Sequence, residues 1–304
     1  MHALVTGGNG FIGSHLVDRL LADGDHVRVL DRGPERFRPP LEGVDYRTGS
    51  VEDPFALAEA LQGIEVVYHL ASTTVPSTSN LNPVADVESN LVSALNLIDQ
   101  MSNAGANRIV FLSSGGAIYG NPRRLPVDED HPTDPISSYG VVKLAIEKYL
   151  GMYQHLKGLR PIVVRPSNPY GPRQSTAGVQ GAVSTFLYRI LTGEQIEIWG
   201  DGTVVRDYLY ITDLVDLCVR AGRSEQCGVF NAGSGEGHRL LDILRAAEAV
   251  SGQEANVRFL PSRQFDVQEV VLDNRRAREG LDWSPEYSLE AGIAEHWKWL
   301  CSVH

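Results

Sequence analysis

The sequence predicts an α/β protein with a Rossmann-type, doubly wound parallel sheet and a smaller C-terminal α/β lobe. In about the first 170 residues, short aliphatic or β-branched runs alternate with amphipathic segments of helix length, which is the pattern of βαβ units. A glycine-rich turn, TGGNGFIG at 6–13, lies between the first apolar run and the first periodic segment. In a doubly wound sheet this turn lies at the carboxyl edge, where phosphate groups bind.

The hydrophobic pattern predicts the elements in order. Strands are expected at 3–6, 27–31, 44–48, 66–70, 108–113 and 161–165, with helices between them beginning near Phe11, Pro54, Val84 and Tyr139. The apolar run at 66–70 is typical of a strand covered on both faces. After about Tyr170 the rhythm is lost, and we expect helices at 182–192, 211–222, 240–251 and 288–300 and strands at 195–199 and 228–232. This division predicts a dinucleotide-binding domain over residues 1–170 and a mainly substrate-binding lobe over 171–304, partly interleaved with the first domain.

Composition disfavours several classes of protein. A chain of 304 residues can bury a core without disulfides or metal ions. Lys and Arg number 27 against 38 Asp and Glu, and the net charge of −11 disfavours nucleic acid or an anionic membrane surface as the main partner. The three cysteines form no CxxC pair, so neither a disulfide framework nor a metal site is expected. No apolar stretch approaches the roughly 20 residues of a membrane span, and we expect a cytoplasmic protein.

The glycine turn predicts a dinucleotide site. Its glycines allow a tight turn and a close approach of the backbone to a pyrophosphate, and Gly13 lets the helix pack against the strand. Free N–H groups at the helix start face the anion, and the expected cofactor-binding residues here are Gly7, Gly10, Phe11, Ile12 and Gly13. The second strand ends in Asp31, whose carboxylate can accept hydrogen bonds from both ribose hydroxyls. That carboxylate favours NAD over NADP because it repels a 2′-phosphate, although the neighbouring Arg32 could serve such a phosphate.

Tyr139 and Lys143 are one helical turn apart and project from one face of a helix. A tyrosine phenolate near neutral pH needs a nearby cation, because the ordinary pKa of tyrosine is about 10. Lys143 and a positively charged nicotinamide ring could both supply that cation. This spacing also occurs by chance on many helices. Here, however, Pro135 and Ser137 mark the helix start, and the strand at 108–113 ends beside the expected nicotinamide pocket.

Several motifs, in the right order and over nearly the whole chain, resemble those of the extended short-chain dehydrogenases/reductases, and within them the nucleotide-sugar epimerases and dehydratases typified by UDP-glucose 4-epimerase. They are TGGNGFIG, Asp31, His69-Leu70-Ala71, Asn90, SSGGAIYG at 113–120, YGVVK at 139–143, RPSNPYGPRQ at 165–174, GDGTVVRDYLYITD at 200–213 and Asn231-Ala232-Gly233. The resemblance implies that NAD stays bound and that Tyr139 takes the proton from the sugar 4-hydroxyl while the C4 hydride moves to NAD⁺. The 4-keto sugar then turns about its diphosphate and receives the hydride on its other face.

The resemblance also implies further roles around the cofactor. Lys143 would hold the nicotinamide ribose and lower the pKa of Tyr139. Ser50 and Val51 would lie at the adenine. The ribose and nicotinamide would be lined by Leu70, Ala71, Asn90, Ser113 and Pro166.

For the substrate, the resemblance implies a UDP-sugar. Residues matching those that bind the nucleotide diphosphate are Asn168, Arg206 and Arg263, while Asp266 matches one at the nucleotide ribose and the strand from Glu197 to Trp199 lines the uracil. An acidic protein that binds a diphosphate needs arginine in forked geometry at the site. The alternative for Arg206 is an ion pair with a carboxylate such as that of Asp207, and His69 at the end of a buried strand is interpreted as structural.

One departure from the family concerns the catalytic hydroxyl. Typical epimerases carry Ser or Thr four positions before the Tyr of the xVYG stretch, and here that position is Gly115. Ser114 is adjacent, but neighbouring side chains on an extended strand point to opposite faces, so it could substitute only if the strand end twists or bulges. A water, or Tyr139 alone, are the other options. Gly116 and Ala117 occupy the positions where a 4,6-dehydratase carries Asp-Glu.

A second departure concerns specificity. Val270 falls at the family position that limits room near the sugar C2 substituent, and its small side chain predicts that 2-acetamido sugars are accepted. Family likeness also implies a homodimer built from the helices at 84–103 and 139–156. The function expected is a UDP-hexose 4-epimerase. The alternatives are a nucleotide-sugar 4-ketoreductase, decarboxylase or dehydratase on the same fold, or a non-catalytic NAD-binding regulator.

Overall fold

A seven-stranded parallel sheet organises the structure, a computed structural model that describes residues 1–176, 181–262 and 267–304. The strand order is β10-β6-β5-β4-β1-β2-β3. The strands are β1 (His2–Thr6), β2 (His26–Asp31), β3 (Val44–Thr48), β4 (Val66–His69), β5 (Arg108–Leu112), β6 (Arg160–Pro166) and β10 (Gly228–Ala232). The predicted Rossmann-type sheet is confirmed, and its first six strands lie within one residue of the predicted bounds at each end.

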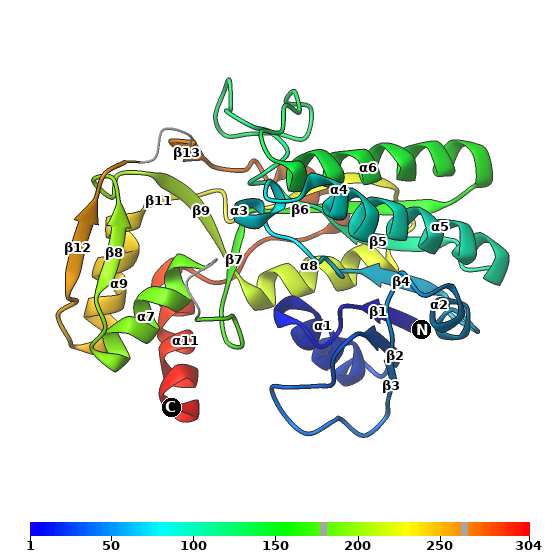
Figure 1. The fold of residues 1–304 in the computed structure, drawn as a ribbon, viewed down its shortest axis with the longest axis horizontal. Coiled ribbons are helices and arrows are strands. Elements are labelled where there is room, and N and C mark those ends of the chain that lie inside the picture. The colour runs from blue at the N-terminus through cyan, green and yellow to red at the C-terminus, as the bar shows by residue number, and fades with distance from the viewer. Residues whose placement is uncertain (177–180, 263–266) are drawn as a thin grey trace.

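Helices cover both faces of this sheet (Figure 1). On one face lie α1 (Phe11–Ala22) and α8 (Ile211–Arg223), and on the other lie α2 (Pro54–Ala60), α5 (Ser93–Ala104) and α6 (Ser138–Lys157). Successive strand residues point to opposite faces. Accordingly, Leu4 of β1 joins the core beneath α5 and α6, whereas its neighbour Val5 joins the core beneath α1 and α8.

The helix expected near Val84 is not a single regular α-helix. After the short α3 (Pro76–Ser79), the chain forms α4 (Pro83–Asp86), then a π-helical turn η1 (Val87–Val92), and then α5. The hydrophobic period does not distinguish a π turn from α-helix, so the sequence could not predict it. Asn90 lies in this turn and is buried. Such turns are frequent at functional sites because they re-aim side chains.

The second lobe lies beyond the carboxyl edge of the sheet (Figure 1). It contains β7 (Asn168–Tyr170), α7 (Ala182–Thr192), β8 (Ile196–Trp199), β9 (Val205–Tyr210), β11 (Gly237–Arg239), α9 (Leu240–Ser251), β12 (Val257–Leu260), β13 (Glu269–Val270), α10 (Arg275–Leu281) and α11 (Leu289–Val303). The sequence did not predict β7, β9, β11, β12 or α10, and the strand that it places before Asp273 ends earlier, at Val270. Most of these elements are very short, and β9 has four buried residues in succession instead of an alternating pattern.

Two elements from the C-terminal part of the chain, β10 and α8, pack within the first lobe. Strand β10 pairs in parallel with β6 and forms one edge of the large sheet, and α8 packs against β4, β5 and β6. A linear boundary at residue 170 therefore does not describe the core of the large sheet. The division into 1–170 and 171–304 stays a prediction for folding units.

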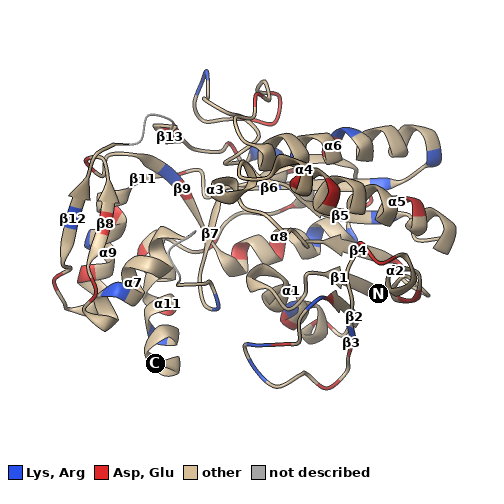
Figure 2. Ribbon diagram, in the orientation of Figure 1, with Lys and Arg blue, Asp and Glu red and all other residues tan. Residues whose placement is uncertain are grey.

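Because the strands are parallel, their carboxyl ends lie at one edge of the sheet. Thr6, Asp31, His69, Leu112 and Pro166 end their strands at the same edge of the sheet. Acidic and basic residues alternate along the ribbon of both lobes (Figure 2). Within the described residues, no helix is long and apolar enough to cross a membrane.

Candidate functional site

The glycine turn after β1 forms a close backbone cradle. Gly7 has φ +74°, and a Cβ there would lie 2.9 Å from the backbone of Ala71. A Cβ on Gly13 would lie 2.1 Å from the carbonyl oxygen of Gly7, so no larger residue fits without moving the backbone. The start of α1 is thereby packed against the turn, with its free N–H groups at the carboxyl edge of the sheet. This geometry fits a dinucleotide pyrophosphate.

Asp31 is oriented by the same turn. Its carboxylate accepts hydrogen bonds from the backbone N–H of Asn9 at 3.0 Å and from that of Gly33 at 3.2 Å. The side-chain amide of Asn9 in turn donates to the carbonyl of Gly33 at 2.7 Å. A carboxylate held by backbone donors at the end of β2 fits the ribose of an adenosine, as the sequence predicts.

A pocket of about 380 Å³ extends from this carboxylate across the sheet edge. Predicted cofactor residues that line it are Gly7, Gly10, Asp31, Arg32, Ser50, Val51, Leu70, Ala71 and Asn90. Lining residues that the sequence analysis missed include Asn9, Gly33, Arg36, Ser72, Thr73, Ser89 and Ser93. Several of them are chain neighbours of predicted residues, which is the signal that could have found them. Among the described residues, the predicted Phe11, Ile12, Gly13, Ser113, Tyr139, Lys143 and Pro166 are not in this lining.

The catalytic candidate Tyr139 lies in the first turn of α6. Ser137 begins this helix, and its side chain accepts a hydrogen bond from the N–H of Gly140 at 3.2 Å. The Ser114 side chain lies close enough to the Tyr139 phenol to lower its pKa by hydrogen bonding. Burial raises the pKa of Tyr139 to about 12, and the hydrogen bond from Ser114 opposes that rise. The phenol and the serine hydroxyl therefore form a pair at the end of β5.

Gly115 lies in a crowded place between β6 and Leu272. Strand β5 ends at Leu112, one residue before the predicted end, but the N–H of Ser113 still donates to the carbonyl oxygen of Val164 at 2.8 Å and that of Gly115 to the carbonyl oxygen of Pro166 at 2.7 Å. A Cβ on Gly115 would lie 2.5 Å from Leu272 Cδ1 and 3.1 Å from the carbonyl oxygens of Arg165 and Pro166. A serine at 115 would thus meet β6 and Leu272. The turn begins at Gly115, directly after Ser114.

Lys143 lies one turn further along α6 and is buried. Its ammonium donates to the carbonyl oxygen of Leu112 at 2.8 Å and lies 5.7 Å from the centre of the Tyr139 ring. Burial lowers the pKa of Lys143 to about 8, while the carboxylates of Glu147 and Asp86 raise it. Lys143 therefore links the catalytic helix to the end of β5.

A buried ion pair that the sequence analysis did not find supports these groups. Arg165 and Glu147 bond through Nη2 and Oε2 at 2.5 Å and through Nε and Oε1 at 3.1 Å, and each side chain is 4% exposed. The Ser113 hydroxyl donates to Glu147 at 2.5 Å, so this predicted cofactor residue points toward α6. Glu147 follows Lys143 at i+4 on the same helix face as Tyr139, which is the signal that could have revealed it.

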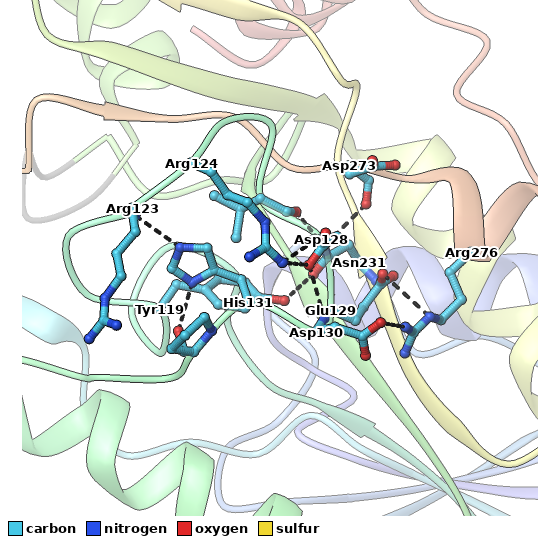
Figure 3. Close-up of polar contacts among 12 residues, drawn as sticks. Tyr119, Arg123, Arg124, Asp128, Glu129, Asp130, His131, Asn231, Asp273 and Arg276 are labelled. Carbon is cyan, nitrogen blue, oxygen red and sulfur yellow. Dashed lines mark hydrogen bonds and ion pairs between the residues drawn. The ribbon is translucent and has the colours of Figure 1, made fainter.

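The same network continues toward the second lobe (Figure 3). Arg165 donates to the Tyr119 hydroxyl at 2.8 Å, and that hydroxyl donates to the side-chain oxygen of Asn231 at 2.7 Å. The N–H of Asn231 donates to Glu129 at 2.7 Å, and Glu129 lies 3.5 Å from Arg276 of α10. Burial raises the pKa of Glu129. A continuous polar chain thus connects β6 and β10 to the 119–131 segment and to α10.

The predicted substrate residues lie in the second lobe. Asn168 of β7 donates to the backbone oxygen of Asp207 at 2.8 Å, and Arg206 of β9 donates to the oxygen of Val205 at 2.8 Å. Asp207 is fully buried and accepts hydrogen bonds from Ser234 and from other neighbours.

Strand β8 presents alternate residues to solvent. Glu197 and Trp199 are exposed, while Ile196 and Ile198 are buried. Trp199 and Phe259 line a pocket of about 760 Å³ together with Gln268, whereas Glu197 is not in that lining among the described residues.

The remaining residues that the sequence singled out are Val270, His69, Arg263 and Asp266. Val270 is buried in a cluster with Ile118, Tyr119, Val127 and Leu272. His69 is buried, its Nδ1 is hydrogen-bonded to the Thr6 hydroxyl at 2.8 Å, and burial lowers its pKa to about 3, in keeping with the structural interpretation. Arg263 and Asp266 lie outside the described residues.

Comparison with known proteins gives consistent matches. Residues 3–233 match the model of the NAD dependent epimerase/dehydratase family. A UDP-glucose 4-epimerase of Mycolicibacterium smegmatis is 38% identical over 97% of each chain. The solved UDP-glucose 4-epimerase of Thermus thermophilus in complex with NAD has a TM-score of 0.94 at 34% identity, covering 100% of both chains. The solved UDP-N-acetylglucosamine 4-epimerase of Methanobrevibacter ruminantium in complex with UDP-N-acetylmuramic acid has a TM-score of 0.94 at 27% identity, covering 100% of this chain and 99% of that one. This chain therefore belongs to the NAD dependent epimerase/dehydratase family and is an NAD-dependent enzyme similar to UDP-sugar epimerases.

Proposed function

We propose that the protein is a UDP-hexose 4-epimerase that also accepts 2-acetamido sugars. The observation that carries this proposal is the grouping of Ser114, Tyr139 and Lys143 at the end of β5, where the charge of Lys143 also lowers the pKa of His69, a residue of the pocket lining. A phenol with one hydroxyl donor and a buried ammonium nearby suits proton removal from an alcohol. Ser114 thus takes the place of the hydroxyl that Gly115 lacks.

The chain's own residues divide the work of such a reaction. Tyr139 exchanges the proton of the sugar 4-hydroxyl, and Ser114 stabilises the phenolate by donating a hydrogen bond. Lys143 places a positive charge near the ring and lowers the cost of that phenolate. Bound NAD⁺ supplies the oxidation and re-reduction of carbon 4. The glycine turn and Asp31 hold the dinucleotide in place during both half-reactions.

The second lobe would hold the nucleotide. Arg206 and Asn168 lie on paired strands at the junction of the two lobes, where a diphosphate would reach from the sugar site. Trp199 and Phe259 offer aromatic surface for a pyrimidine base in the pocket at the ends of β8 and β12. Roles for Arg263 and Asp266 stay predictions from the sequence, as does the cytoplasmic location.

The first test measures turnover and its dependence on the phenol. Purified protein without added reductant is incubated separately with UDP-glucose, UDP-galactose, UDP-GlcNAc and UDP-GalNAc, and the sugars are resolved by NMR. We expect interconversion of a C4 pair. Tyr139→Phe is expected to lower turnover by about 10²–10⁴-fold while NAD stays bound, because it removes only the hydroxyl that transfers the proton. Net consumption of NADH or NADPH, or an eliminated or decarboxylated product, would instead identify the ketoreductase, dehydratase or decarboxylase. No product with NAD bound would favour the regulator.

The second test concerns Ser114. Ser114→Ala should reduce kcat by about 10–100-fold, the range expected for one hydrogen bond to a charged group. Because that hydrogen bond lowers the pKa of Tyr139, its loss should also move the acidic limb of the kcat–pH profile to higher pH. Ser114→Thr retains the hydroxyl and serves as the control. An unchanged rate in the Ala variant would assign the role to a water or to Tyr139 alone.

The third test concerns the sugar C2 substituent. Val270→Tyr adds bulk within the Ile118, Tyr119 and Leu272 cluster and should lower kcat/KM for UDP-GlcNAc about tenfold more than for UDP-glucose. Val270→Ile is the matched control for a small increase in volume. A strong preference for UDP-glucose in the unmodified enzyme, with the same preference in the Tyr variant, would refute the assignment.

The fourth test concerns assembly, because we also propose a homodimer. The structure separates the apolar residues of the two predicted helices: Ile98, Val142, Ile146, Leu150 and Tyr153 are buried in the chain's own core, whereas Val84, Val92, Val141, Tyr149 and Met152 are exposed. Sedimentation at micromolar concentration should give a dimer that Met152→Glu disrupts. Phe55→Glu, on an exposed apolar residue of α2, should leave the dimer intact. A monomeric unmodified protein would contradict the proposal.

A further inference from the structure

Asp86, the last residue of α4, is a fully buried carboxylate outside the predicted site residues. Its Oδ1 accepts hydrogen bonds from the Thr74 hydroxyl at 2.6 Å and from the Asn90 side-chain amide at 2.9 Å. Its Oδ2 accepts one from the Ser138 hydroxyl at 2.6 Å. These three donors are neutral, so they solvate the charge of the carboxylate without neutralising it.

The three donors come from three different segments. Thr74 belongs to the loop after β4, Asn90 to the π-helical turn, and Ser138 is the first residue of α6. Asn90 lines the dinucleotide pocket and accepts a hydrogen bond from the N–H of Thr73, another lining residue, at 2.9 Å. Ser138 directly precedes Tyr139. Asp86 therefore connects the wall of the cofactor pocket to the start of the catalytic helix.

The charge of Asp86 also acts on the catalytic pair. Its carboxylate raises the pKa of Tyr139 and the pKa of Lys143, because a nearby negative charge disfavours the phenolate and favours the ammonium. Other charged groups also face the pair, and the carboxylate of Glu147 raises the pKa of Lys143 more than that of Asp86 does. Glu147 of α6 is ion-paired with Arg165 of β6. His69 of β4 is neutral near pH 7, because its pKa is about 3.

We propose that Asp86 is a positioning residue for Tyr139 and Lys143, which sets the start of α6 against the cofactor pocket through its hydrogen bonds to Ser138 and Asn90 and adds a negative charge to their surroundings. The inference rests on the role that the proposed function gives to these two residues. Asp86 itself acts through Ser138, through Asn90 and through its field on the pair. The hydrogen bonds of Asp86 position the helix start, whereas its charge raises the pKa of Lys143. The two contributions can therefore be separated by mutation.

Asp86→Asn removes the charge and keeps most of the bonding. Its remaining oxygen can still accept from Thr74 and Asn90, and the Ser138 hydroxyl can turn to accept from the new amide. Ser138→Ala is the matched control, since it removes one hydrogen bond and leaves the carboxylate in place. The readout is the titration of Lys143, followed by NMR of protein labelled at lysine Cε. The chain has only four lysines, Lys143, Lys148, Lys157 and Lys298, and Lys143→Met identifies the resonance.

In the unmodified protein the Lys143 signal should titrate with a pKa of about 8. With all variants in the same cofactor state, Asp86→Asn should lower this midpoint by on the order of one pH unit, and Ser138→Ala should leave it unchanged. An unchanged midpoint in Asp86→Asn, or an equal shift in Ser138→Ala, would overturn the proposal. If Asp86→Asn does not fold, Asp86→Glu provides the test, because it keeps the charge and disturbs the bonds. It should lower kcat and keep the Lys143 midpoint, and a shifted midpoint would contradict the proposal.

This readout does not require turnover. A protein that epimerises no UDP-sugar but shows the predicted Lys143 shift would refute the proposed function and leave the role of Asp86 standing. A protein that epimerises UDP-sugars but whose Lys143 midpoint is unchanged in Asp86→Asn would refute the role of Asp86 and leave the proposed function standing.

Discussion

The buried ion pair between Arg165 and Glu147 is the interaction on which the geometry of the site depends. It joins β6 to α6, and through Ser113 it also holds the end of β5. Removing one partner of a buried pair leaves an uncompensated charge, which typically costs about 3–5 kcal/mol. Here both carboxylate oxygens of Glu147 are occupied, so the pair has a defined geometry as well as a complementary charge.

Helix α6 extends that geometry to the proposed catalytic residues. Tyr139, Lys143 and Glu147 are spaced four residues apart along one face of α6, so fixing Glu147 fixes the direction of the other two. The far end of this row is held separately, by Ser137 at the helix start and by Asp86 through Ser138. A helix held at both ends of its functional face restricts the motion of the phenol, which favours a preorganised site.

Polar contacts as well as strand pairing connect the two lobes. Strand β7 follows β6 almost directly and pairs with β9, which brings Asn168 and Arg206 toward the carboxyl edge of the large sheet. The chain of hydrogen bonds from Arg165 through Tyr119 to Asn231 reaches the 119–131 segment and α10. The position of the substrate lobe is therefore coupled to the same ion pair that orients α6.

The sequence by itself determined the parallel sheet, the glycine turn, Asp31 and the Tyr139–Lys143 spacing, because each depends on local periodicity or on a short motif whose residues are chain neighbours. Only the tertiary structure decided the orientation of Ser114, the place of β10 in the first sheet, and the partners of Asp86 and Glu147. Glu147 meets Arg165 across a sequence separation of 18 residues, and Asp86 meets Ser138 across 52. Contacts of this kind are made by the packing of whole elements and leave no periodic signal in the chain. Ser114 is a further case, because its approach to Tyr139 depends on how the segment after β5 packs against α6, which hydrophobic alternation does not indicate.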